Sequence, residues 1–306
     1  MHRTWMVLGV GLALVGAACS GVSQADGSGD SLDTDAYLEV VANTESEYAQ
    51  QFKTILEATT RSYSTRGVLF EAVDEAGFPG GAQLALTQAQ GVTPPGDFAQ
   101  DHANWIQLRS TIVGIAEDDF VPALESRDLQ ELLAVLTKVD QSYGSFLKGL
   151  SREFCLAAAF NSDLCPAGDD LPGGEYGQQV HEVLRINRLD TSGLFTFVAD
   201  MSPEERSVRL AEVQPQIESS LKSAGDAMAR IDPPSAFVEE HAAFVRFFEE
   251  QYSTAVAITE ANAEGDDARV LILFGESGEV LNRLRQSITP EYGPIAVPFF
   301  ATGIAG

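Results

Sequence analysis

The chain contains one sequence phrase twice, at a constant separation. The first copy spans residues 93–106 (TPPGDFAQDHANWI) and the second spans residues 232–245 (DPPSAFVEEHAAFV), so that corresponding residues lie 139 positions apart. The motif residues of the first copy are Pro94, Pro95, Phe98, His102 and Trp105, and their counterparts are Pro233, Pro234, Phe237, His241 and Phe244. The same separation relates Leu132 to Leu271 and Leu133 to Ile272 without a gap. A fixed separation over such a span predicts a duplicated structural unit.

Each copy of the phrase has the features of a helix start. Thr93 and Asp232 precede a proline, which favours the extended backbone of an N-cap residue. The double proline is expected to occupy the first helical positions, where a missing N–H costs no hydrogen bond. Spacings of four and three residues then place Phe98, His102 and Trp105 on one face, which a helical bundle would bury, and the second copy has the same spacing.

The remaining sequence is also patterned for helices. No stretch alternates cleanly between polar and apolar residues, and no Asn-Gly or Asp-Gly turn joins two β-branched runs. The sequence therefore predicts an all-α fold of two tandem four-helix units, packed together as one domain pair. We expect the first unit at 34–155, a linker at 156–175, the second unit at 176–290 and an extended apolar tail at 291–306.

The amino terminus has an export pattern. A short basic start is followed by the apolar run Trp5–Val15, which is too short to remain as a membrane-spanning helix. The run ends in Val15-Gly16-Ala17-Ala18-Cys19, which resembles the lipobox of bacterial lipoproteins, with Gly16 where leucine is usual. The resemblance implies a signal peptide at 1–18 and a lipid on Cys19, which would anchor an extracytoplasmic protein to the bacterial cell membrane. Plain secretion is the alternative.

The residues after Cys19 are rich in Gly, Ser and Asp, so we expect 19–33 to be a flexible tether. If Cys19 carries lipid, two cysteines remain, Cys155 and Cys165, and in an oxidising compartment such a pair forms a disulfide. A metal site would need further Cys or His ligands nearby, and a redox pair would need a spacing of two residues.

Charge excludes some partners. The chain has 19 basic and 45 acidic residues, a formal net charge of −26. Nucleic acids and anionic lipid surfaces need a positive protein surface, so neither is expected as an electrostatic partner. A solvated acidic surface explains the charge, and salt adaptation or cation attraction are the alternatives.

Signatures of catalysis are absent. The chain has no Gly-x-Ser-x-Gly elbow, no phosphate-binding glycine loop, no dinucleotide fingerprint and no His-Glu-x-x-His motif. We therefore predict a non-enzymatic helical module, without a cofactor, that binds an envelope protein or a small apolar ligand. A carboxylate-dependent enzyme is one alternative, because acidic residues are abundant. The aromatic residues of 233–261 fit both a packed core and a groove for an apolar ligand.

The two motif histidines give a further alternative. His102 and His241 both lie on the apolar face of a predicted helix, and a buried imidazole needs a hydrogen-bond partner or a ligand. The favoured interpretation is that each histidine bonds a neighbouring backbone carbonyl or carboxylate within its own unit. The alternative is that the two rings meet and bind one metal ion or haem, although two ligands fall short of the three or four that a metal site normally uses.

Overall fold

The computed structural model describes residues 32–60, 66–159, 161–194 and 201–300. In these residues the protein is helical and has no β-strand, which confirms the predicted all-α class. The predicted signal peptide, the predicted lipid-attachment site at Cys19 and most of the predicted tether lie outside the described residues. None of the described helices combines the length and the apolar character needed to cross a membrane.

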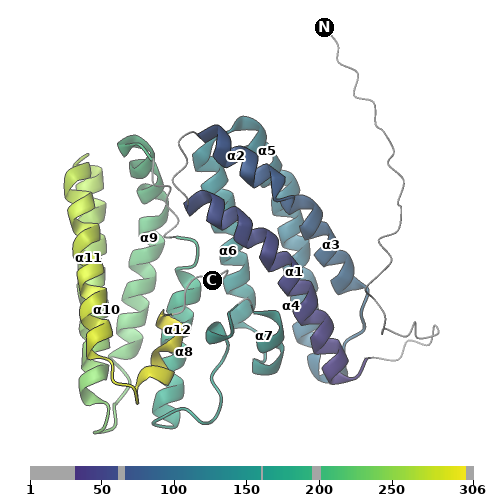
Figure 1. The fold of residues 1–306 in the computed structure, drawn as a ribbon. Helices are drawn as coiled ribbons and strands as arrows, with labels where there is room; N and C mark the ends of the chain where they lie inside the picture. Colours follow the sequence, from purple (N-terminus) through teal and green to yellow (C-terminus); the bar gives the residue numbers. More distant parts are fainter. Residues whose placement is uncertain (1–31, 61–65, 160, 195–200, 301–306) are drawn as a thin grey trace. The chain divides into compact units, whose positions relative to one another are not determined.

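The first half of the chain contributes the helices that are drawn from purple to teal in Figure 1. They are α1 (Thr34–Thr60), α2 (Arg66–Glu75), α3 (Phe78–Gln90), α4 (Ala99–Ile115), α5 (Val121–Ser126), α6 (Leu129–Lys148) and α7 (Arg152–Ala158). Three short segments complete this half: the 3-10 turns η1 (Gly96–Phe98) and η3 (Ser162–Leu164), and the π-helical segment η2 (Ala116–Phe120).

The second half contributes the green to yellow helices. They are α8 (Glu175–Asp190), α9 (Pro203–Met228), α10 (Val238–Ala263), α11 (Asp267–Ser287) and α12 (Gly293–Phe300). Helix α9 begins with a capping box, in which Ser202 and Glu205 each bond the other's backbone N–H.

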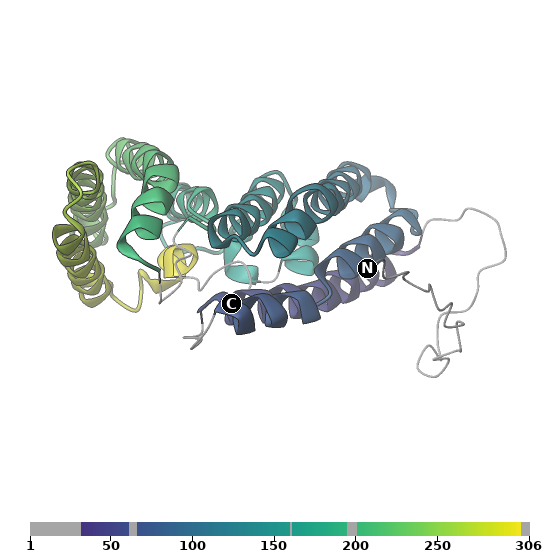
Figure 2. The same cartoon turned by 90° about the horizontal axis from the view of Figure 1, so that it is seen from above.

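The two halves have the same order of packing. In the first half α1 packs on α3, α3 on α4, α4 on α6, and the short α7 returns to α1. In the second half α8 packs on α9, α9 on α10, α10 on α11, and the short α12 returns to α8. Figure 2 shows the two sets as neighbouring groups of helices, and the main helix-to-helix contact between them is that of α6 with α8.

The α6–α8 contact depends on a small residue and on a buried arginine. A Cβ atom at Gly144 would lie 2.7 Å from the carbonyl oxygen of Leu189, so only glycine allows this approach. Arg185, on α8, donates to the carbonyl oxygens of Leu147 (3.2 Å) and Lys148 (3.5 Å) at the end of α6. These are carbonyls that the helix itself leaves without a partner, and a cation is favourable at that end.

The double prolines do not lie where the sequence predicted. Pro95 is extended (φ −58°, ψ 152°), and both prolines of each copy precede the helix, which begins at Val238 in the second half. The residue before α4 is Phe98 and the residue before α10 is Phe237, and each donates its N–H to the second proline of its copy. The prolines therefore form a tight turn ahead of the helix, and Thr93 and Asp232 are not its caps.

The predicted extended tail is also wrong in its described part, because residues 293–300 form α12. Pro294 lies in the first turn, where the absent N–H costs nothing, and Tyr292, Ile295 and Ala296 are buried against the second half. By its place against α8, α12 is the counterpart of α7. The predicted boundary at 155 therefore falls inside α7, and the predicted boundary at 290 falls before α12 begins.

The separation of 139 residues changes to 138 after η2. Asp128 and Asp266 are the N-caps of α6 and α11, and each follows a residue with positive φ, Arg127 (54°) and Gly265 (72°). Leu271, half-exposed at 50%, is therefore not the counterpart of the fully buried Leu132. The π-helical segment η2 lies in the first half between the positions that match at a separation of 139 and those that match at 138.

The predicted disulfide is confirmed. Cys155, in α7, and Cys165, just after η3, are bonded, with their Cα atoms 5.6 Å apart. Both cysteines are buried, and η3 packs on α8 and α12. The disulfide therefore ties η3, which contacts the second half, to α7 and the core of the first half.

Candidate functional site

The motif histidines occupy matching positions in the two halves. Nδ1 of His102 forms a hydrogen bond with the hydroxyl of Tyr37 (2.8 Å), and Nδ1 of His241 forms one with the hydroxyl of Tyr176 (3.2 Å). In both pairs the ring centroids are 5.8 Å apart and the ring planes differ by 56°. Burial lowers the pKa of both histidines, so the neutral ring is favoured in each.

These contacts favour the local interpretation of the histidines: Nδ1 of each ring bonds a tyrosine, and His241 also forms a hydrogen bond with the backbone of Met228. His102 lies on α4 and His241 lies on α10, and each contacts the first helix of its own half. None of the described contacts joins the two imidazoles. In the described ranges no three His, Cys, Asp or Glu side chains are grouped so that they could bind a metal ion.

A buried polar cluster distinguishes the first half from the second. The carboxylate of Glu45 accepts hydrogen bonds from Trp105 Nε1 (2.6 Å), Tyr143 (2.6 Å) and Arg109, and Arg109 also lies over the ring of Tyr48 at 4.2 Å. Glu45 and Arg109 are almost completely buried. The positions 139 residues later hold Leu184, Phe244 and Phe248 in place of Glu45, Trp105 and Arg109, so these three positions are apolar there.

The Glu45 cluster is not a site for a ligand. Its oxygens are occupied by the indole, guanidinium and phenol groups around them, and it does not line either of the two hollows described below. Buried ion pairs of this kind contribute to the specificity of a core. Hydrophobic periodicity does not reveal the Glu45 cluster. Comparison of the two copies does indicate it, because Trp105 and Arg109 stand where the second copy has phenylalanine.

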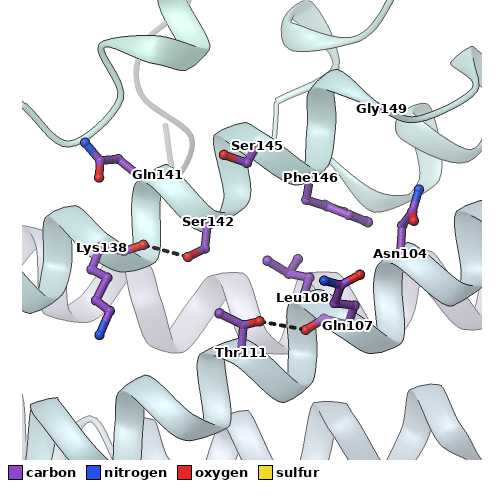
Figure 3. A pocket seen from close by; sticks show the side chains of 10 residues that line it. All are labelled: Asn104, Gln107, Leu108, Thr111, Lys138, Gln141, Ser142, Ser145, Phe146 and Gly149. Carbon is purple, nitrogen blue, oxygen red and sulfur yellow. Dashed lines mark hydrogen bonds between the residues drawn. The ribbon is translucent and has the colours of Figure 1, made fainter. Parts of the chain in front are cut away.

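One surface hollow lies between α4 and α6 in the first half (Figure 3). It has a volume of about 480 Å³, and its polar lining consists of Asn104, Gln107, Thr111, Lys138, Gln141, Ser142 and Ser145. Thr111 Oγ1 donates to the Gln107 carbonyl and Ser142 Oγ donates to the Lys138 carbonyl, both within their own helix. Since these hydroxyls bond their own helix, they are not directed at a common point, and we assign no ligand to this groove.

A different hollow lies inside the second half. It has a volume of about 460 Å³ and is lined by residues of α8, α9, α10, α11 and α12, with a mainly apolar surface. We call it the α8–α12 cavity. Its larger apolar side chains are Leu210, Ile217, Leu221, Phe247, Ile258, Phe274, Leu281, Phe299 and Phe300. The volume is in the range of sites for small molecules.

Several residues that line the α8–α12 cavity are smaller or more polar than the residues about 139 positions earlier in the first half. Asn187, on α8, and Thr191, at its C-terminal cap, stand at the positions of the buried Tyr48 and Phe52 of α1. On α10, Gln251 and Thr254 correspond to the buried Ile112 and Ile115. On α11, where the separation is 138, Ser277 and Leu281 correspond to Val139 and Tyr143.

The polar groups of the cavity are fixed by their neighbours. Asn187 donates to Ser220 Oγ (2.9 Å), and Gln251 donates to the Ser277 carbonyl (2.9 Å) while its Oε1 accepts from Ser277 Oγ (2.7 Å). Gln214 donates to the Ala255 carbonyl (3.4 Å). A few oriented polar groups in an apolar wall are typical of a small-molecule site.

Among the described residues, the charged side chains of the lining are Arg188 and Arg285, with no aspartate or glutamate. Burial lowers the pKa of Arg188, and the charge of Asp140, on α6, opposes that effect. Burial raises the pKa of Asp140 to about 7, with Arg188 opposing, and Asp140 Oδ1 has no hydrogen-bond partner among the described residues. A pair of carboxylates, as the alternative of an enzyme requires, does not line this cavity.

The aromatic residues of α10 contribute to the core and to the wall of the cavity. Phe244, Phe247 and Phe248 are buried in the core of the second half, and Phe247 also lines the α8–α12 cavity. The cavity lies within the second half rather than between the halves. Its sequence signal is the set of substitutions between the copies, which the motif residues alone do not reveal.

Comparison with known proteins gives no relative from which a function could be transferred. No protein-family model matches the chain, and neither a curated protein nor a solved structure matches it.

Proposed function

We propose that this protein is a non-enzymatic lipoprotein of the bacterial cell envelope whose second helical half binds a small apolar ligand. The single observation that carries the binding function is the α8–α12 cavity, because it replaces a packed core at the corresponding place in the first half. Opening a cavity in a core destabilises a protein in proportion to the empty volume. A ligand that occupies the cavity would offset this cost.

We also propose that the two halves arose by duplication of one helical unit. The shared packing order, the matching Tyr–His pairs and the paired N-caps support this origin. On this view the first half kept a closed core and acts as a support, while the second half became the binding half.

The binding function can be tested with a neutral fluorescent apolar probe, N-phenyl-1-naphthylamine, on the mature protein. The test variant is Gly278→Phe, because Gly278 lines the cavity and a Cβ atom there meets no atom within 4 Å. The matched control is Gly275→Phe, on the same helix, where a Cβ atom is equally free but the residue does not line the cavity. Both changes replace a helical glycine, so neither lowers helix propensity.

Wild type and Gly275→Phe should bind one probe molecule with a rise in fluorescence, and Gly278→Phe should lose the rise. Equal binding by all three proteins would place the probe elsewhere and contradict the assignment of the cavity.

The proposed lipid attachment to the cell membrane needs a separate test. Metabolic labelling with a fatty-acid probe should mark the wild-type protein and not Cys19→Ala, because the thiol of Cys19 is the predicted site of lipid attachment. Equal labelling of the two proteins would exclude Cys19 as that site.

A further inference from the structure

The charge of the α8–α12 cavity differs from that of the chain as a whole. The chain carries 45 acidic and 19 basic residues, yet the described lining of the cavity contains two arginines and no acidic residue. A positive lining in a strongly negative protein would select for the sign of a ligand's charge, because a fixed charge in an apolar wall is less screened than one in water.

Arg285 is the more accessible of the two arginines. It lies on α11, its side chain is exposed, and its Cζ atom is 5.7 Å from the ring centroid of Phe300, which also lines the cavity. Arg285 forms no ion pair with a described residue, whereas Arg283, two positions earlier, pairs with Glu250 at 2.6 Å. The stacked guanidinium is thus held at the rim of the cavity with its N–H donors available to a ligand.

Arg188 adds positive charge from α8. It is half-buried, lines the same cavity, and has Asp140 as a nearby charge. Asp140 does not line the cavity, so it does not oppose an anion inside the cavity by direct contact.

We infer that the ligand of the α8–α12 cavity is an amphipathic carboxylic acid, with its hydrocarbon body among Phe247, Phe274 and Phe299 and its carboxylate bound by Arg285 at the rim. This inference rests on the proposed binding function and adds the chemical class of the ligand. Arginine donates two parallel N–H groups to a carboxylate, which an alcohol of the same chain length cannot match.

The test is displacement of the neutral probe by dodecanoic acid and by dodecan-1-ol, which share the chain and differ in the head group. For wild type we expect dodecanoate to displace the probe at a concentration about fivefold lower than the alcohol does. In Arg285→Gln this preference should fall below about twofold, with displacement by the acid and by the alcohol each measured relative to the probe affinity of that variant. Arg283→Gln is the control on the same helix and should retain the wild-type preference.

Each outcome separates the two proposals. Equal displacement by acid and alcohol in wild type would overturn the inference and leave the apolar binding function standing. A preference for the acid that persists in Arg285→Gln would overturn the role of Arg285. Failure of the probe to bind wild type would remove the proposed function itself.

Discussion

Trp105 Nε1 donates a hydrogen bond of 2.6 Å to Glu45. In the second half the residues at the corresponding positions, Phe244 and Leu184, have apolar side chains. The donor and the acceptor therefore differ together between the halves. A carboxylate without its donors, or an indole N–H without its acceptor, would be a buried polar group without a partner. The first half therefore fills this place in the core with a paired donor and acceptor, and the second half fills it with two apolar side chains.

The first half should consequently not tolerate the change of Glu45 alone. Glu45→Leu leaves Arg109 charged and buried without a carboxylate, and we expect a loss of about 3 to 5 kcal/mol in the free energy of unfolding. Urea unfolding followed by circular dichroism measures this loss. Glu250→Leu is the control, because the Glu250–Arg283 pair is exposed and its removal should cost less than about 1 kcal/mol. Similar losses in the two variants would contradict the assigned role of the Glu45 cluster.

The contact between the halves should depend on Gly144. Gly144→Ala places a methyl group 2.7 Å from the Leu189 carbonyl oxygen, so α6 and α8 must move apart, at an expected cost of about 1 to 3 kcal/mol. At Gly275 the same change meets open space and should raise stability by up to about 1 kcal/mol. Thermal unfolding of both variants is the measurement, and a shift of equal sign in both would show that the close approach at Gly144 has no energetic effect.

The helical class was accessible from the sequence because it depends on local patterns. The capping box at Ser202 and the apolar stripe of α6 are local features of this kind, because each is formed by residues only a few positions apart in the sequence. The double prolines were placed wrongly because a proline at N1 and a proline in a turn before the N-cap have nearly the same φ, and only ψ separates them.

The α8–α12 cavity, in contrast, could not be predicted from local sequence patterns. Periodicity identifies the face of α10 that is buried, but whether Phe247 meets another side chain or an empty volume depends on residues of α8 and α11. The one-residue shift at η2 also hid the correspondence of α6 and α11, because a gapless alignment pairs buried Leu132 with half-exposed Leu271. Packing between distant helices, rather than local pattern, determines the cavity.

The disulfide should stabilise the joint between the halves. Replacing Cys155 and Cys165 with serine removes a crosslink that closes a short loop, and we expect a loss of about 2 to 3 kcal/mol in the free energy of unfolding. Urea unfolding of the double variant and of the wild type, with and without reductant, is the measurement. Reductant should lower the stability of the wild type alone, and an equal effect on both proteins would contradict this role.

Asp140 should make stability depend on pH near neutrality. Burial raises the pKa of Asp140 to about 7 in the folded protein, whereas an unfolded aspartate has a pKa near its ordinary value of about 4. The folded state therefore holds a proton that the unfolded state has released, and this group's contribution to stability falls as pH rises from about 4 to about 7, by at most about 1.4 kcal/mol per pH unit.

Asp140→Asn removes this titration while keeping the size of the side chain, which matters because Gly193 packs closely against Asp140. The difference in free energy of unfolding between the variant and the wild type should grow in favour of the variant between pH 4 and pH 7 and then stay constant above about pH 8. Urea unfolding at intervals of one pH unit measures the difference. A difference that is independent of pH would mean that Asp140 keeps an ordinary pKa in the fold, and a difference that grows in favour of the wild type would mean that Arg188 holds Asp140 in its charged form.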